Sequence, residues 1–97
     1  MINGKVIQFL EEIADLLETR NDNMFKIRSY RLAAKNIGSL KMDLRDLHRQ
    51  GRLRDIPGVG KAIADKIAEI LETGDLGYLR KLREDVYGSS DPLIRLS

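Results

Sequence analysis

A tight turn, Ile56-Pro57-Gly58-Val59-Gly60-Lys61, constrains the fold of this chain more than any other stretch. Pro57 fixes its own φ and cannot donate a backbone hydrogen bond, while Gly58 and Gly60 can adopt left-handed conformations that a Cβ atom disfavours. An apolar run with helical spacing follows at once, formed by Ile63, Ile67, Ile70 and Leu71. The sequence therefore predicts a chain reversal that opens directly onto a helix.

The start of this helix, near Gly60, is a candidate anion-binding site. Its first N–H groups lack intrahelical partners and carry the positive end of the helix dipole. Without a Cβ at 58 and 60, a phosphate diester can approach the backbone, and Lys61 adds a positive charge. Taken alone, Pro-Gly-x-Gly is better explained as a plain link between two helices. A basic stretch precedes the turn and includes Arg49, Arg52 and Arg54. In this context the turn resembles a helix-hairpin-helix, a motif that binds the DNA backbone without reading the base sequence.

Positive charge is concentrated in the middle of the chain. Residues 26–66 carry eleven Lys and Arg against four Asp, a net charge of +7. Residues 1–25, with two basic and five acidic side chains, sum to −3, and residues 67–97, with four basic and six acidic, sum to −2. This segregation indicates a polyanionic partner. A solvated basic face, or one that meets an acidic protein, is the alternative.

Length and composition set the class of protein. With 97 residues and 42% hydrophobic residues, the chain suits one small domain with a single modest core. Without cysteine it has no disulfide framework or thiolate metal site, and it suits a reducing compartment. No apolar run approaches the roughly 18 residues of a membrane span. We expect a soluble cytoplasmic protein that makes no membrane contact.

Helical periodicity recurs along the chain, and no segment alternates like a strand. Helices are expected over about 4–20, 23–39, 43–50, 60–72 and 76–86, with a short helical piece around Leu53 and Ile56. The predicted fold is all-α, a compact bundle of four to five short helices containing one helix-hairpin-helix. Residues 1–87 form the predicted domain. Residues 88–97 form a predicted linker toward a following domain, because the apolar residues at the end of the linker have no partner element after them. A terminal tail that packs back onto the core is the alternative.

Two helices should present charged faces. The first has an acidic polar face, which would repel a phosphate backbone and should point away from nucleic acid. On the second, Arg28, Arg31 and Lys35 recur at i, i+3 and i+7 and share an outward face, with Lys26 near its start.

Lys66 is the candidate nucleophile. On a helical wheel it falls at the edge of the inward arc, where its ammonium is partly desolvated. Partial burial, and crowding by Lys61, Arg31 or Lys35, would lower its pKa and leave free amine for a Schiff base. A lysine that only extends its charge to solvent is the alternative from spacing alone. His48 has no serine or cysteine nucleophile nearby.

Three stretches, 12–18, 23–34 and 51–61, resemble in order and spacing the amino-terminal domain of family X DNA polymerases, in their bacterial or archaeal form. The resemblance spans about residues 5–86. It implies binding of gapped or nicked DNA near a 5′-phosphate, as part of a DNA repair polymerase whose polymerase domains follow. No Asp-x-Asp pair for two magnesium ions is present, so polymerase chemistry does not reside in this chain. In the polymerase beta branch the domain is also a 5′-deoxyribose-phosphate lyase.

The resemblance also assigns roles to residues. It implies that Lys66 is the Schiff-base lysine, that Tyr30 is the aromatic of the lyase pocket, and that Lys26 contacts the 5′-phosphate. No cofactor is required, but a Na⁺ or K⁺ ion at the hairpin is implied, held by the backbone carbonyls of Arg54, Ile56 and Val59. The candidate DNA-binding set is Lys26, Tyr30, Arg31, Lys35, Arg54, Gly58, Val59, Gly60 and Lys61.

Three positions depart from the polymerase beta pattern. Phe25 stands where that branch has a histidine that stacks on DNA, and Ala62 and Tyr78 replace two lysines that hold the 5′-phosphate. These changes weaken the phosphate pocket, while hairpin binding of DNA does not depend on them. We therefore expect sequence-independent DNA binding, with weak lyase activity at most. A non-catalytic interaction module with an acidic protein partner is the alternative.

Overall fold

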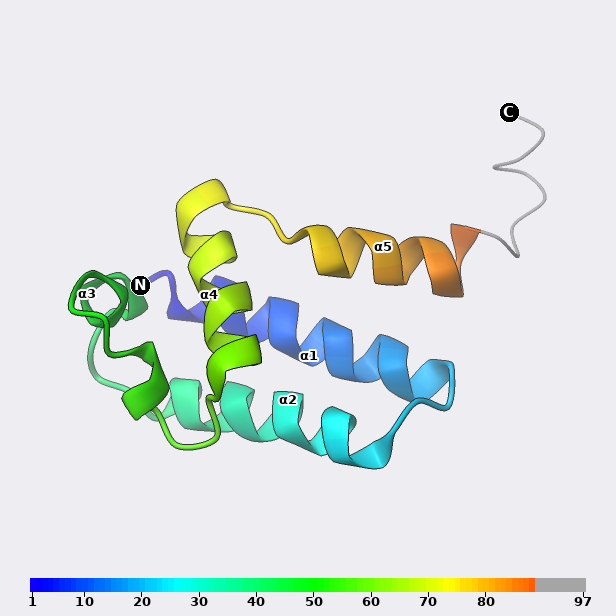
Figure 1. Ribbon diagram of the computed structural model, residues 1–97, viewed down its shortest axis with the longest axis horizontal. Helices are drawn as coiled ribbons and strands as arrows, with labels where there is room; N and C mark the ends of the chain where they lie inside the picture. Colours follow the sequence, from blue (N-terminus) through cyan, green and yellow to red (C-terminus); the bar gives the residue numbers. More distant parts are fainter. Residues whose placement is uncertain (89–97) are drawn as a thin grey trace.

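The computed structural model describes residues 1–88, and it is all-α over that range, as predicted (Figure 1). The helices are α1 (Asn3–Thr19), α2 (Met24–Gly38), α3 (Leu44–Arg49), the 3₁₀ helix η1 (Leu53–Asp55), α4 (Lys61–Thr73) and α5 (Gly77–Val86). Each lies within a residue or two of its predicted range. Apart from Gly88, the predicted linker lies outside the described residues.

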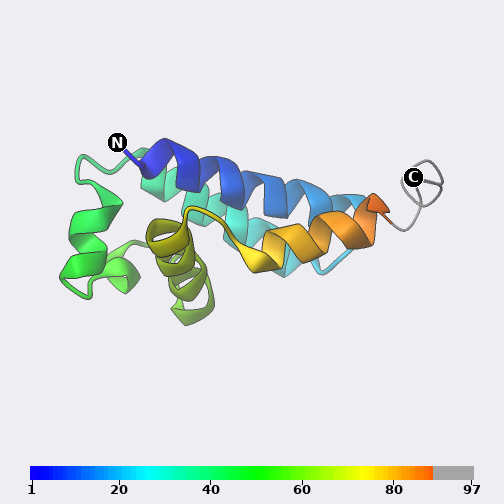
Figure 2. The same cartoon turned by 90° about the horizontal axis from the view of Figure 1, so that it is seen from above.

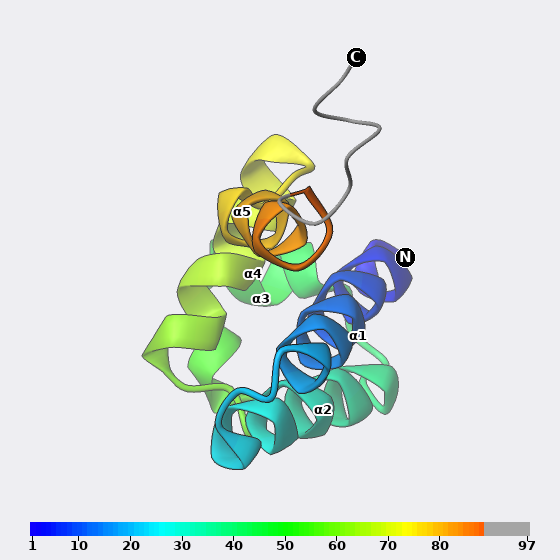
Figure 3. The ribbon, with the colours of Figure 1, turned by 90° about the vertical axis from the view of Figure 1, so that its right-hand side faces the viewer.

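The helices α1 and α2 form an antiparallel pair along the long axis of the molecule (Figure 1). Figure 2 shows α5 running alongside α1, while α3, η1 and α4 gather at the end of the pair where the chain starts. In the end-on view of Figure 3, α4 lies on the opposite side of the molecule from α1. The buried core draws on every one of these elements and includes Leu10, Ile13, Leu17, Ile27, Ile37, Leu44, Ile67, Ile70 and Leu79. None of the helices in residues 1–88 is both long and apolar enough to cross a membrane.

Short polar side chains cap the start of two helices, α2 and α3. The Asn23 side chain accepts hydrogen bonds from the backbone N–H groups of Phe25 (2.7 Å) and Lys26 (3.4 Å), and so caps α2. Asp43 caps α3 in the same way through the N–H of Arg45 at 2.8 Å. Gly74 ends α4 in the left-handed region, with φ of 78°. These local signals explain why helix boundaries could be predicted.

Two polar contacts far apart in the sequence hold the helices together. Buried Asn3 donates to the carbonyl of Met42 (2.9 Å) and accepts from the N–H of Leu44 (2.9 Å), which ties the start of α1 to the α2–α3 connection. On the other side, Arg83 of α5 donates two hydrogen bonds to Glu12 of α1, at 2.5 and 2.7 Å. Helix α5 is therefore fixed against α1, and Tyr78 in its first turn is held in place.

Candidate nucleic-acid interface

The hairpin between η1 and α4 is a tight turn closed by its own backbone. The N–H of Val59 donates to the carbonyl of Ile56 at 3.0 Å, across Pro57 and Gly58. Gly58 has a φ of +85°, as the third residue of such a turn requires. Gly60, in contrast, is extended, with φ of −91° and ψ of −172°. Of the two glycines, only Gly58 uses the left-handed conformation that the sequence made available to both.

Gly58 is needed for packing as well as for conformation. A Cβ on Gly58 would lie 3.1 Å from Leu32 Cγ and 3.4 Å from Asn36 Nδ2, so the turn sits directly on α2. Asn36 Nδ2 also donates to the carbonyl of Pro57 at 2.6 Å. A Cβ on Gly60 would meet nothing within 4 Å. Space for a ligand to approach the backbone therefore remains at Gly60, whereas Gly58 already contacts the protein.

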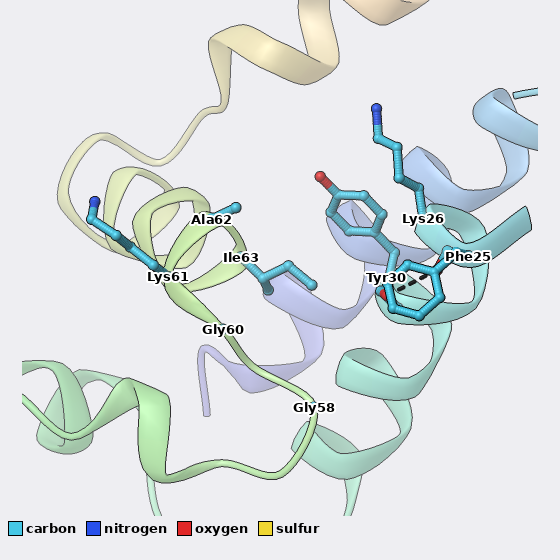
Figure 4. Close-up of a pocket in the computed structure, with 9 residues that line it drawn as sticks. Phe25, Lys26, Tyr30, Gly58, Gly60, Lys61, Ala62 and Ile63 are labelled. Carbon is cyan, nitrogen blue, oxygen red and sulfur yellow. Dashed lines mark hydrogen bonds between the residues drawn. The ribbon is translucent and has the colours of Figure 1, made fainter. Parts of the chain in front are cut away.

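A pocket of about 340 Å³ lies between α2 and the hairpin (Figure 4). Its walls are the stretch from Phe25 to Tyr30 on α2 and the stretch from Gly58 to Ile63, where the hairpin enters α4. The pocket brings together five of the predicted DNA-binding residues, which are Lys26, Tyr30, Gly58, Gly60 and Lys61. Phe25 stands at its edge with 78% of its surface exposed.

The start of α4 forms one wall of this pocket with its backbone donors unused. The first intrahelical bond runs from the N–H of Ala64 to the carbonyl of Gly60, so the N–H groups of residues 61–63 have no partner within the helix. No side chain caps this end of α4. Because the helix has 13 residues, its dipole adds a positive potential at the same wall.

The two lysines of the pocket differ in their surroundings. Lys61 pairs with Asp65 at 2.8 Å and lowers the pKa of that carboxyl below its ordinary value. In Figure 4 its side chain is directed away from α2. Lys26 makes no ion pair with any described residue, and its side chain extends from α2, the opposite wall of the pocket, beside Tyr30 (Figure 4). The uncompensated positive charge of the pocket therefore comes from Lys26.

Lys66 is half-buried and does not line the pocket. Its Nζ lies 4.6 Å from the centroid of the Tyr78 ring. Burial lowers the pKa of Lys66 below its ordinary value, and the charge of Lys26 lowers it further. The lowered pKa of Lys66 agrees with the prediction from the sequence. The predicted cationic neighbours, Lys61, Arg31 and Lys35, are wrong, because the cation that lowers the pKa of Lys66 is Lys26 on the first turn of α2.

Two tyrosines, Tyr30 of α2 and Tyr78 of α5, lie near each other. Tyr30 lines the pocket and is only 5% exposed, and its burial, followed by the nearby Tyr78, raises its pKa well above the ordinary value. The hydroxyl of Tyr78 is buried and meets the geometry of a hydrogen bond with no described residue, Tyr30 included. In the sequence, Tyr78 could be recognised only as a replacement for a lysine of the polymerase beta pattern. Its contact with Lys66 joins residues twelve positions apart on different helices, and no local pattern indicated it.

Several predicted binding residues lie elsewhere. Arg31 pairs with Asp15 (3.0 Å) and Glu18 (3.4 Å) on the acidic face of α1, so its charge is compensated away from the pocket. Lys35 is exposed and does not line the pocket. The side chain of Val59 is buried, so that only its backbone is available to a ligand.

The carbonyls predicted to hold a monovalent cation have unused acceptor capacity. Arg54 lies in the middle of η1, and the residue three positions after it is Pro57, which has no N–H to donate to the Arg54 carbonyl. Within residues 1–88 neither this carbonyl nor that of Val59 accepts a hydrogen bond, and that of Ile56 accepts one. Carbonyl oxygens suit a hard cation, so these groups fit Na⁺ or K⁺. No cluster of three or more His, Asp or Glu side chains offers a further metal site in the described part.

Comparison with known proteins identifies this arrangement. Residues 1–76 match the family described as the helix-hairpin-helix domain. The chain is also similar to the amino-terminal region of the DNA polymerase/3′-5′ exonuclease PolX of Bacillus subtilis (strain 168), with 32% identity over 91 residues. That match covers 94% of this chain, which spans only 15% of the length of the relative. The chain therefore belongs to the helix-hairpin-helix domain family, in the form that resembles the amino-terminal domain of family X DNA polymerases.

Proposed function

We propose that this domain binds gapped or nicked DNA at a 5′-phosphate, as the amino-terminal domain of a DNA repair polymerase in the cytoplasm. Membership of the helix-hairpin-helix family and similarity to part of a DNA polymerase support DNA binding and a polymerase that follows. The observation that carries the finer proposal is the pocket, whose opposite walls hold unpaired Lys26 and the uncapped start of α4.

The pocket offers a phosphate two kinds of interaction. The free N–H groups of residues 61–63 can donate to phosphate oxygens, and Lys26 supplies a full charge from the opposite wall. A cation on the carbonyls of Arg54, Ile56 and Val59 would add positive charge at the hairpin. All these groups address the sugar–phosphate backbone and none reads a base edge, so binding is independent of sequence.

A salt titration with gapped DNA tests this proposal. Backbone binding requires log K to fall linearly with log salt, equally for two unrelated DNA sequences. Lys26→Ala should weaken DNA binding and reduce the slope of log K against log salt by about 1, the value for one phosphate contact. Lys41→Ala, an exposed lysine outside the pocket, serves as the matched control. Negligible DNA affinity at moderate salt would refute the proposal and favour the rival module for an acidic protein.

A second candidate function is 5′-deoxyribose-phosphate lyase activity, which the lowered pKa of half-buried Lys66 favours. The free amine of Lys66 would attack the C1′ aldehyde of the sugar and expel water to form a Schiff base. Loss of a C2′ proton would then break the C3′–O bond, which leaves a 5′-phosphate on the DNA. Weak activity is expected, because Ala62 places no charge in the pocket wall and misplacement by about 1 Å costs on the order of 100-fold.

Borohydride trapping separates the roles of the lysines. Lys66→Ala and Lys66→Arg should both abolish the covalent complex with DNA that carries a 5′-deoxyribose phosphate, and Lys66→Arg should retain DNA binding. Lys61→Ala should keep trapping and weaken binding. If Lys66→Ala leaves trapping unchanged, another amine, Lys26 or Lys61, carries the activity.

A further inference from the structure

The ammonium of Lys66 rests on an aromatic ring. Its Nζ is 4.6 Å from the centroid of Tyr78, which is within the range of a cation–π interaction. Lys66 comes from α4 and Tyr78 from α5. The contact therefore joins the helix that follows the hairpin to the last described helix.

Tyr78 is partly buried and packs against the hydrophobic core. The next residues along α5, Leu79 and Leu82, are buried in the core, and Arg83 is bonded to Glu12 of α1. The Tyr78 hydroxyl is buried without a hydrogen bond in the described part of the chain. The interaction of Tyr78 with Lys66 is made by the face of the ring, over which the Lys66 ammonium lies.

The charged groups around Lys66 act in opposite directions on its pKa. Lys26 on α2 disfavours the ammonium, while Asp65 and Glu69 on α4 favour it. Tyr30 on α2 is neutral, because burial raises its pKa. On the far side, Tyr78 lines a smaller pocket with three charged residues, Arg20, Lys81 and Asp85. On α5, the Tyr78 ring contacts the Lys66 ammonium, and its quadrupole attracts the cation but not the neutral amine.

We propose that Tyr78 is a positioning residue for Lys66, and that its ring stabilises the ammonium and so sets the pH above which Lys66 acts as an amine. The inference rests on the proposed lyase function for its catalytic consequence. At neutral pH, Lys66 then serves chiefly as a second cation beside Lys26, and Schiff-base formation increases in alkaline solution.

Two substitutions of Tyr78 test the proposal. Tyr78→Phe keeps the ring and removes a hydroxyl that makes no hydrogen bond within residues 1–88, so it should titrate and unfold as the wild type does. Tyr78→Leu keeps apolar bulk but loses the ring face. The titration midpoint of Lys66 should then fall by about half a pH unit, which corresponds to roughly 3-fold more free amine.

The midpoint is measured in two ways on the same chains. The first is the NMR titration of ¹³C-methylated lysines, with the Lys66 signal assigned by its absence in Lys66→Arg. The second is the pH profile of borohydride trapping, which should move in the same direction. If Tyr78→Leu lowers the unfolding midpoint so far that the titration cannot be followed, Tyr78→Met replaces it.

The outcomes separate the two proposals. A midpoint that is unchanged or higher in Tyr78→Leu overturns the inference about Tyr78, and so does an equal shift in Tyr78→Phe. A lower midpoint in the NMR titration without any trapping in the wild type supports the inference and refutes the lyase proposal.

Discussion

The side-chain amide of Asn36 donates a 2.6 Å hydrogen bond to the carbonyl of Pro57, which attaches the hairpin to α2. This bond matters for the pocket, because α2 carries Lys26 and Tyr30 while the hairpin leads to Gly60. Beside it, Gly58 lies against Leu32 of the same helix. One hydrogen bond and one close contact thus join the hairpin directly to α2.

Removing the Asn36 amide should loosen that attachment. Asn36→Ala is expected to lower the free energy of unfolding by about 1 kcal/mol, a typical value for one hydrogen bond, and to weaken binding of gapped DNA. Urea denaturation and a binding titration measure the two effects. Ser39→Ala, an exposed position just after α2, is the control. Unchanged binding in folded Asn36→Ala would show that the bond does not position the hairpin for DNA.

The two glycines of the hairpin should respond differently to alanine. Gly58→Ala places a Cβ at a φ of +85° and 3.1 Å from Leu32, so it should destabilise the fold by about 1–2 kcal/mol. Gly60→Ala has open space and an ordinary φ, so stability should change little while DNA binding weakens. Thermal unfolding and DNA titration distinguish these effects. Full DNA affinity in Gly60→Ala would argue against close approach of a phosphate at this position.

Releasing Lys61 from its ion pair should strengthen DNA binding. Asp65→Asn removes the carboxylate that lies 2.8 Å from Lys61 and so removes a negative charge from α4. We expect affinity for gapped DNA to rise about 2- to 5-fold at low salt, with the gain shrinking as salt is added. Fluorescence anisotropy over a salt series measures it. An affinity equal to the wild type at every salt concentration would place Lys61 outside the DNA contact.

The ion pair between Glu12 and Arg83 should appear in the pH dependence of stability. The hydrogen bond from Arg83 lowers the pKa of the Glu12 carboxyl below its ordinary value of 4.5. The stability that this ion pair provides is therefore present above pH 4.5 and is lost as the pH falls through the lowered pKa. Glu12→Gln should therefore be less stable than the wild type at pH 7, by about 0.5 kcal/mol for a pair this exposed, and equal to it near pH 2. Urea titrations at several pH values test this. If Glu12→Gln remains less stable than the wild type by the same amount in acid, the cause is lost packing and not the lost ion pair.

Local patterns in the sequence predicted the helices because the causes of each helix are local. Helical spacing of apolar residues, the caps Asn23 and Asp43, and the stop at Gly74 all act within a few residues. The all-α class and the hairpin followed from the same signals. The resemblance to family X polymerases added Lys26 and Tyr30, which the structure places in one pocket.

What the sequence did not show are relations between distant residues. Asn3 is buried through bonds to Met42 and Leu44, and nothing around Asn3 in the sequence marks it. Helical spacing placed Arg31 on a basic face, but the identity of its partners depends on how α2 packs against α1. In the same way, the ring under Lys66 depends on how α5 packs. Periodicity gives the face of a helix, and packing decides what that face meets.

The most direct test of the account compares gapped DNA that carries a 5′-phosphate with the same DNA ending in a 5′-hydroxyl. The wild type should bind the phosphorylated DNA more tightly by about 10-fold, the value expected for one charge-assisted contact. In Lys26→Ala that preference should largely disappear, whereas Lys41→Ala should retain it. Equal affinities of the wild-type domain for the two DNAs would contradict the claim that the pocket between α2 and the hairpin binds a 5′-phosphate.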